Sequence, residues 1–301
     1  MPRIVSLLPA GTEIACALGA RAELVGRSHE CDYPVGVERL PVVSTPSLDL
    51  TGLSQAQIDA AVSSHMKAGE SLYVVDEALL RDLAPDVILT QNLCQVCAPS
   101  GTELTRALTT LPTRPQIVYL TPQTLAEIDE NILTVGDAIG RASDARALVG
   151  DIQARLARLR RARQAVARRP RVTFLEWIDP FFCAGHWVPE MIDIAGGDDP
   201  LGRPGRDSVR VSWDEVRACN PEIVVVAPCG FGLADAARLA AELPPIPNAR
   251  VCPVDANAYF ARPGPRYVDG IEVLAEIFQS VSRSFAASST YPISRDSARA
   301  S

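Results

Sequence analysis

The chain of 301 residues is long enough to form one large domain or two domains of moderate size, each with its own apolar core. Its 36 Asp and Glu residues outnumber its 29 Lys and Arg residues, and this acidic balance argues against a protein that neutralises nucleic-acid phosphates. The sequence contains no window of about 18 apolar residues that could span a bilayer. We therefore expect a small molecule or another protein as partner, with no nucleic acid and no direct membrane insertion.

An apolar run follows Arg3 near the N-terminus, as in a secretory signal, but Pro9, Gly11 and the charged Glu13 interrupt it. We therefore predict a cytoplasmic protein, with a periplasmic or cell-surface location as the alternative if the start site is misassigned. In the cytoplasm the eight cysteines would stay reduced and would be available as thiols or metal ligands.

Strands and helices alternate along the N-terminal half. Residues 3–9 form a short apolar run that predicts a strand, and Thr12 is placed to cap a helix that ends at Gly19. Residues 23–28 predict a second strand, which leads directly into the loop SHECDYP at 28–34. This loop would lie at the carboxyl end of a strand, where open α/β sheets usually bind ligands.

The same alternation continues further along the chain. The spacing of apolar residues predicts helices at 54–69 and 76–85, and buried strands are predicted at 86–91 and 116–122. Strands that alternate with helices indicate a parallel sheet covered on both faces.

Residues 125–167 contain no proline and show helical spacing among many arginines, which predicts two helices, the second of them long. We interpret the arginines as the solvated face of an amphipathic helix. After Pro170 the alternation begins again, so we predict an α/β fold with two lobes, each with a mainly parallel sheet, joined by one long connecting helix. The predicted segments are an N-terminal lobe at 1–136, a connecting helical segment at 137–169, a C-terminal lobe at 170–281 and a disordered tail at 282–301.

Clusters of polar and aromatic residues follow the predicted strands. If both lobes present the carboxyl ends of their strands to one cleft, these clusters face one another around a ligand. The loop histidines suit either a ligand contact or an ordinary loop hydrogen bond, and the aromatic residues suit either stacking on a ligand or core packing. The predicted ligand-binding residues are His29, Glu30, Tyr33, Glu176, His186, Trp187, Glu190, Tyr259, Phe260 and Arg262.

Two turn-rich loops, at 202–208 and 261–266, contain arginines. Their guanidinium groups could contact phosphate or carboxylate groups, or the loops could be plain surface turns. Arg262, in the second loop, is the arginine that we place at the ligand.

Cys94 and Cys97 form a Cys-x-x-Cys pair just after a predicted strand. Such a pair can be redox-active, metal-binding or simply buried. A structural zinc site would normally show a second Cys or His pair at ligand spacing, and the sequence has none. A metal site assembled across the cleft stays open, and its predicted ligands are Cys31, Cys94, Cys97 and Cys229.

The common catalytic motifs are missing from the sequence: it has no nucleophile elbow, phosphate-binding loop, dinucleotide fingerprint or metalloprotease helix. We therefore predict a binding protein with no catalytic residue rather than an enzyme. The alternative hypothesis is a cytosolic metalloprotein or enzyme, in which the cysteines hold a metal ion or an iron–sulfur cluster and Glu30, Glu176 or Glu190 acts as acid or base.

Five segments carry a resemblance to a known family. In order and spacing, they are similar to the substrate-binding proteins of iron-chelate and cobalamin ABC importers, and most similar to the cobalamin-binding branch. The resemblance covers about residues 3–278. The segments are RIVSLLPAGTEIACALG, LVGRSHECDYP, LAPDVILTQ, DPFFCAGHWVPEMIDIAGG and AYFARPGPR.

The resemblance implies two α/β lobes joined by a rigid helix, a ligand held between them with slight closure, and an ABC permease as partner. It also implies that aromatic side chains pack on a corrin ring: one of the family's two aromatic positions matches Tyr259, with Phe260 next to it, and the other falls on Glu30. The first hypothesis is therefore a protein that binds cobalamin or a related metal chelate. In it, Trp187 also packs on the macrocycle, and a loop histidine, His29 or His186, approaches the metal.

Overall fold

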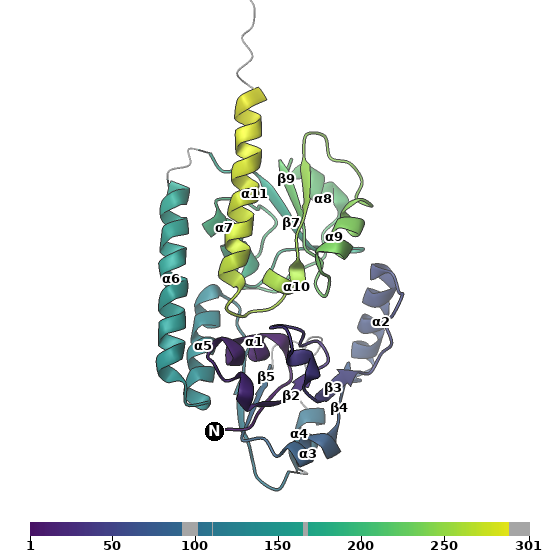
Figure 1. Cartoon of the computed structure of the whole chain (residues 1–301). Coiled ribbons are helices and arrows are strands. Elements are labelled where there is room, and N and C mark those ends of the chain that lie inside the picture. The colour runs from purple at the N-terminus through teal and green to yellow at the C-terminus, as the bar shows by residue number, and fades with distance from the viewer. Residues whose placement is uncertain (92–101, 110, 165–167, 289–301) are drawn as a thin grey trace, which may run out of the picture.

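The computed structural model describes residues 1–91, 102–109, 111–164 and 168–288. Two α/β lobes lie one above the other, joined along one side by long helices (Figure 1). The sheets of both lobes are mainly parallel. The predicted fold class is therefore confirmed, while the exact domain boundaries remain predictions.

The N-terminal lobe is built on a six-stranded sheet of order β4-β3-β2-β1-β5-β6, in which β4 runs antiparallel to β3 and the other neighbours are parallel. Strand β5 has the sequence VILT and is buried throughout, as expected for a central strand covered on both faces. The strands are β1 (Ile4–Ser6), β2 (Leu24–Ser28), β3 (Val42–Pro46), β4 (Tyr73–Val75), β5 (Val87–Thr90) and β6 (Gln116–Tyr119). The helices of this lobe are α1 (Pro9–Ala17), α2 (Gln55–Lys67), α3 (Glu77–Leu83) and α4 (Thr102–Thr109), with short 3-10 turns at Arg21–Glu23 and Val37–Arg39.

The start of α1 differs from the prediction. Proline occupies the first turn of the helix, where its missing N–H costs no hydrogen bond, so α1 begins at Pro9. Thr12 therefore lies inside the helix and does not cap it. Its hydroxyl instead donates a hydrogen bond to Sγ of Cys31, at 3.1 Å.

The C-terminal lobe has a four-stranded sheet of order β10-β9-β7-β8, in which β8 is antiparallel to β7. Its central strand β9, with the sequence IVVV, is again fully buried. The strands are β7 (Val172–Ile178), β8 (Phe181–Cys183), β9 (Ile223–Val226) and β10 (Arg250–Pro253). The helices are α7 (Val188–Ala195), α8 (Trp213–Ala218), α9 (Leu233–Ala240) and α10 (Ala256–Tyr259).

Three helices join the lobes: α5 (Leu125–Ala138), α6 (Ala142–Gln164) and α11 (Tyr267–Ser288). The long helix α6 packs on α5 near the N-terminal lobe and on α7 and α11 of the C-terminal lobe (Figure 1). Helix α11 continues to Ser288, so the first part of the predicted tail, 282–288, is helical. The rest of the predicted tail, 289–301, lies outside the described residues.

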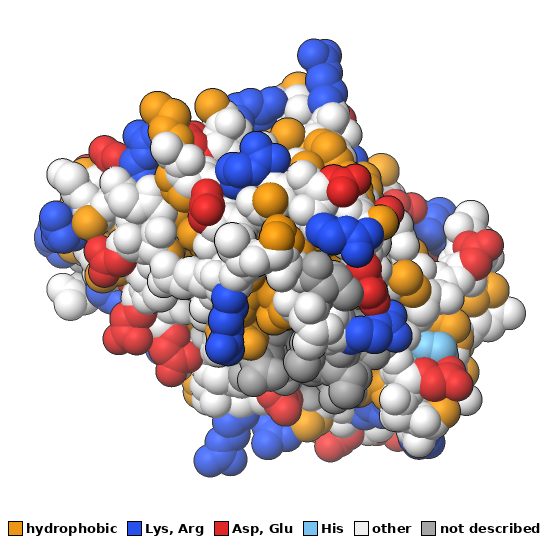
Figure 2. Space-filling model, turned by 90° about the horizontal axis from the view of Figure 1, so that it is seen from below, with side chains coloured by type: hydrophobic (Ala, Val, Ile, Leu, Met, Phe, Trp, Pro, Cys, Tyr) orange, Lys and Arg blue, Asp and Glu red, His pale blue; other side chains and the backbone are white. Residues whose placement is uncertain are grey.

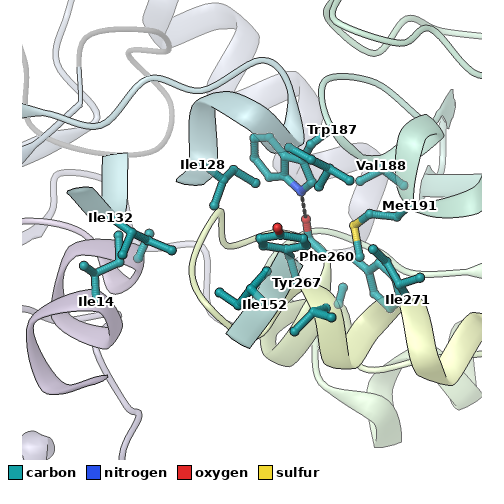
Figure 3. Close-up of a cluster of buried hydrophobic side chains, with 14 of the residues drawn as sticks. Ile14, Ile128, Ile132, Ile152, Trp187, Val188, Met191, Phe260, Tyr267 and Ile271 are labelled. Atoms are coloured by element: carbon teal, nitrogen blue, oxygen red, sulfur yellow. Dashed lines mark hydrogen bonds between the residues drawn. The ribbon is translucent and has the colours of Figure 1, made fainter. Parts of the chain in front are cut away.

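One apolar core runs through the junction of the two lobes. It contains Ile14 of α1, Ile132 of α5, Ile152 of α6 and Ile271 of α11, each at most 3% exposed (Figure 3). Tyr267 lies in the same cluster, and its hydroxyl donates a hydrogen bond to the buried Asp129, at 3.0 Å. Because apolar contact is continuous from one lobe to the other, the α6 side is the rigid side of the molecule.

On the face shown in Figure 2, acidic and basic side chains are interspersed rather than gathered into a single basic patch. Within the described residues, no helix combines the length and the apolarity that crossing a membrane requires.

The packing of α5 on α6 can be tested at Gly136, where an added methyl would collide with the side chain of Ala145. Gly136→Ala is expected to lower the free energy of unfolding by about 1–3 kcal/mol through overpacking. The control is Gly150→Ala in α6, where an added Cβ would meet open space. It is expected to raise stability by about 0.5–1 kcal/mol through helix propensity. Urea unfolding of both variants measures the difference, and equal effects would contradict this packing.

Candidate functional site

The loop after β2 in the N-terminal lobe meets the segment between α10 and α11 in the C-terminal lobe. Side chains of both lobes are in direct contact there, at the carboxyl ends of the parallel strands. We call this group of residues the interlobe site. Its members are Glu13, Asp32, Tyr33, Tyr259, Arg262 and Arg266.

Glu13 of α1 is the buried centre of the interlobe site. Arg266 donates two hydrogen bonds to its carboxylate, from Nε at 2.8 Å and from Nη2 at 2.6 Å. Arg262 adds a third contact through Nη1 at 3.4 Å. The Glu13 side chain is only 2% exposed, and a charge at that depth is tolerated because both guanidinium groups neutralise it.

Asp32 holds Arg262 from the solvent side. Arg262 donates to both oxygens of this carboxylate, at 2.5 and 3.2 Å, and to the backbone oxygen of Glu30 at 3.2 Å. Burial acts to raise the pKa of Asp32, but hydrogen bonding and charge from Arg262 outweigh it, so the pKa lies below its usual value. The predicted site residue Arg262 thus joins the two lobes.

Two tyrosines from opposite lobes flank Arg266. Its guanidinium carbon lies 3.8 Å from the ring centre of Tyr33 and 5.9 Å from that of Tyr259, within the range of cation–π contact. Tyr33 is 43% exposed, whereas Tyr259 is half-buried against the core. The predicted residues Tyr33 and Tyr259 are therefore brought together by an arginine that the sequence analysis did not single out.

His29 and Glu30 lie next to this group, at the end of β2. Nδ1 of His29 is 3.2 Å from the backbone oxygen of Ser44, and burial lowers the pKa of the imidazole. The Glu30 side chain is 41% exposed, yet desolvation by the surrounding protein raises the pKa of its carboxyl. Both residues are accessible enough to reach a molecule held between the lobes.

Glu176 and His186 belong to a second group, within the C-terminal lobe. The backbone N–H of Gly185 donates to Oε1 of Glu176 at 2.9 Å, which fixes the loop after β8 against β7. Desolvation of the partly buried carboxyl raises the pKa of Glu176 to about 7, and hydrogen bonds from Gly185 and Ser208 offset only part of this rise. His186 has a left-handed backbone, with φ of 52°, and its Nε2 lies 3.2 Å from Asp207.

Trp187, Phe260 and Glu190 lie away from the interlobe site. Trp187 is 9% exposed and Phe260 is 3% exposed, and the indole N–H of Trp187 donates to the backbone oxygen of Phe260 at 3.1 Å (Figure 3). In this conformation neither ring offers a face to a ligand. Glu190 accepts a hydrogen bond from the backbone of Leu125 at the start of α5, so it joins α7 to α5.

The predicted metal ligands are not assembled in the part of the chain that the structure describes, where no three His, Cys, Asp or Glu side chains are grouped to hold a metal ion. Cys94 and Cys97 lie outside the described residues. Burial raises the pKa of Cys31 to about 11, which keeps its thiol protonated and disfavours metal ligation. Cys229 is exposed.

Comparison with known proteins identifies the class of protein. Residues 4–243 match the family model described as periplasmic binding protein, so the chain belongs to the periplasmic binding protein family. Its relatives include a vitamin B12-binding protein of Vibrio parahaemolyticus serotype O3:K6 (strain RIMD 2210633). The two are 23% identical over 286 residues, which cover 93% of this chain and 90% of that protein.

Solved structures share the fold at low sequence identity. The apo periplasmic heme-binding protein RhuT from Roseiflexus sp. RS-1 superposes with a TM-score of 0.69 at 21% identity and covers 93% of this chain and 99% of its own. The periplasmic vitamin B12-binding protein BtuF of Vibrio cholerae gives 0.64 at 22% identity, with 94% and 98% covered. A periplasmic heme-binding protein from Pseudomonas aeruginosa gives 0.68 at 21% identity, with 92% and 93% covered.

These findings confirm the resemblance to substrate-binding proteins, and they agree with the prediction of a binding protein rather than an enzyme. They overturn the predicted cytoplasmic location, because the family and its solved members are periplasmic. That prediction was based on the interrupted apolar run near Glu13, and the structure gives this carboxylate another role, as the buried partner of two arginines.

Three members of the interlobe site were not predicted: Glu13, Asp32 and Arg266. Each lies inside a motif that had been singled out, but the sequence signals pointed elsewhere. Arg266 ends the turn-rich loop 261–266, for which a carboxylate partner was one of the open alternatives. The charge of Glu13 within an apolar helix was the signal that could have identified its partner.

Removal of the Glu13 charge tests the buried ion pairs. Glu13→Gln keeps the shape of the side chain but leaves two arginines without their shared carboxylate, and it is expected to lower the free energy of unfolding by about 3–5 kcal/mol. Asp32→Asn is the matched control: the Asp32 side chain is 62% exposed, and about 0–1 kcal/mol is expected. Urea unfolding gives both values, and equally small losses would show that Glu13 is not a buried partner in solution.

The raised pKa of the partly buried Glu176 predicts a pH dependence of stability. Its folded pKa of about 7 lies above its usual value of 4.5, so its contribution is complete below pH 4.5 and is lost as the pH rises through 7. The lost stability is on the order of 3 kcal/mol. Glu176→Gln should therefore flatten the decline in unfolding free energy between about pH 5 and pH 8. Glu276→Gln, on the exposed face of α11, controls for the loss of one charge, and an unchanged decline in Glu176→Gln would contradict the assignment.

Proposed function

We propose that this protein binds cobalamin between its two lobes and presents it to an ABC permease. The proposal is supported by membership of the periplasmic binding protein family and by relatives that are named for binding vitamin B12 or heme. Those two ligands share a large, planar, metal-containing macrocycle. The observation that carries the proposal is the pair of tyrosines from opposite lobes, Tyr33 and Tyr259, whose ring centres lie 3.8 and 5.9 Å from the guanidinium carbon of Arg266.

Aromatic rings suit a macrocycle because they offer apolar faces to its broad, weakly polar surface. Tyr33 projects from the N-terminal lobe and Tyr259 from the C-terminal lobe, so a ring between the lobes can contact both. Arg266 lies close to both rings, and its planar guanidinium can itself stack on the ligand. Trp187 and Phe260 are buried in this conformation and do not contact the ligand in this arrangement.

His29 is the better placed of the two histidines to approach the metal of the chelate. The backbone oxygen of Ser44 can only accept, so its contact with Nδ1 assigns the ring proton to that nitrogen and leaves the lone pair on Nε2. A metal-ligating histidine commonly has its other nitrogen bonded in this way. Nε2 of His29 is 3.9 Å from Oε1 of Glu30, beyond hydrogen-bond distance, whereas Nε2 of His186 lies 3.2 Å from Asp207.

The charges at the interlobe site favour a corrin over a porphyrin. Arg262 and Arg266 are matched by Glu13 and Asp32, so neither arginine requires a carboxylate from the ligand. Glu30 adds a further acid at the same place. Corrin side chains end in neutral amides, which can donate to the Glu30 carboxyl, whereas the propionates of heme find no unpaired arginine among the described residues of the interlobe site.

Equilibrium dialysis of the purified protein against cyanocobalamin and, separately, hemin tests the proposal. Saturable one-to-one binding of cyanocobalamin is expected, with weaker binding of hemin. Tyr33→Ala is expected to weaken the binding about tenfold, because one aromatic contact contributes about 1.4 kcal/mol.

The matched control is Tyr119→Ala, since Tyr119 is similarly exposed, at 50%, but ends the edge strand β6 of the same lobe. It should bind like the wild type. Tight binding of hemin without binding of cyanocobalamin would show that the ligand is a porphyrin rather than a corrin. Binding of neither ligand would contradict the proposal.

A further inference from the structure

Helix α2 stands beside the junction of the two lobes, on the side opposite the connector α6 (Figure 1). It is held loosely on its own lobe, because Gln55 is the single buried residue of its 13, while Ile58 and Val62 are half-buried. Near its C-terminal end, Nε2 of His65 binds the backbone oxygen of Ser71 at 2.8 Å, which anchors that end to the N-terminal lobe. An element with so little buried apolar surface is able to open locally.

The N-terminal end of α2 is instead tied to the C-terminal lobe. The backbone N–H of Ile178, at the end of β7, donates to Oε1 of Gln55 at 2.9 Å in a buried hydrogen bond. One turn further on, Arg210 donates to Asp59 at 2.6 Å, and this ion pair is more open to solvent. Helix α2 thus bridges the two lobes, with one end on each.

Only one of the two polar atoms of the Gln55 side-chain amide takes part in these contacts. Its Oε1 accepts from Ile178, whereas its Nε2 is buried and lacks a hydrogen-bond partner within the described ranges. Gln55 is only 4% exposed in this conformation. A buried donor without an acceptor costs about 1–3 kcal/mol, and an oxygen atom from a bound molecule would remove that cost.

We infer that α2 is a latch across the junction of the two lobes and that Gln55 is a ligand-binding residue. Its Oε1 holds the C-terminal lobe while its Nε2 donates to an oxygen at the edge of the bound ligand. The inference rests on the proposed function, because the acceptor is a peripheral oxygen of the chelate, either an amide carbonyl of a corrin or a carboxylate of a porphyrin. Entry and exit of the ligand then require the contacts of Gln55 and Asp59 to break.

Two substitutions separate the latch from ligand recognition. Gln55→Glu keeps an oxygen for the N–H of Ile178 but replaces the donor by a second acceptor, so it should weaken binding about tenfold, mainly through faster dissociation. Asp59→Asn removes the Arg210 ion pair without touching the ligand. It should speed association and dissociation alike, up to about fivefold, and leave Kd within about a factor of two.

Stopped-flow measurements with cyanocobalamin and with hemin give these rates at about pH 8, where a glutamate is normally ionised. One measurement on the ligand-free protein tests the latch without any ligand. Hydrogen exchange of the Ile178 amide should be slow in the wild type and in Gln55→Glu. It should be faster in Gln55→Met, which has no oxygen to accept the bond.

The two parts of the inference fail in different ways. Unchanged exchange of the Ile178 amide in Gln55→Met, or unchanged rates in Asp59→Asn, would overturn the latch. Wild-type affinity in Gln55→Glu for the chelate that binds would overturn the role of Nε2. If the wild type binds neither chelate, the proposed function fails, and the ligand contact of Gln55 fails with it. The latch is then tested only by the hydrogen exchange of the Ile178 amide in the ligand-free protein.

Discussion

The arrangement of the site depends on one buried carboxylate, that of Glu13. A charge that is almost fully removed from water must be neutralised, and the N-terminal lobe does so with arginines from the other lobe, Arg262 and Arg266. The ion pairs therefore fix the relative position of the lobes at the ends of their strands. They also orient the guanidinium of Arg266, against which the rings of Tyr33 and Tyr259 lie. The three charged groups that hold the lobes together thus also belong to the proposed binding site.

The fold could be predicted from the sequence because its main signals are local. Buried runs such as VILT and IVVV, and the long proline-free region that contains α5 and α6, specify their elements without reference to distant residues. The strands β3, β4 and β8 were not predicted. They are three to five residues long, and β4 and β8 are antiparallel edge strands, so their pairing depends on neighbours that no short window shows.

The site was predicted less well because it depends on contacts between residues far apart in the chain. Glu13 and Arg266 are separated by 253 positions, and either one alone could be a surface charge. Trp187 and Phe260 are a different case: their neighbours in sequence are polar or glycine-rich, which favoured a stacking role, whereas the structure buries their rings in the core. Gln55 carried no signal at all, since a glutamine at the start of a helix is ordinary.

The distribution of contacts around the junction also limits how a ligand could enter. On the α6 side, the lobes share a continuous apolar core with a buried Tyr267–Asp129 hydrogen bond, and separation there would expose that core. On the α2 side, the contacts between α2 and the C-terminal lobe in the described part of the chain are one hydrogen bond and one partly exposed ion pair. The free energy needed to open the two sides is therefore very unequal. A release of α2, rather than a rotation of whole lobes, is the motion that this structure makes least costly.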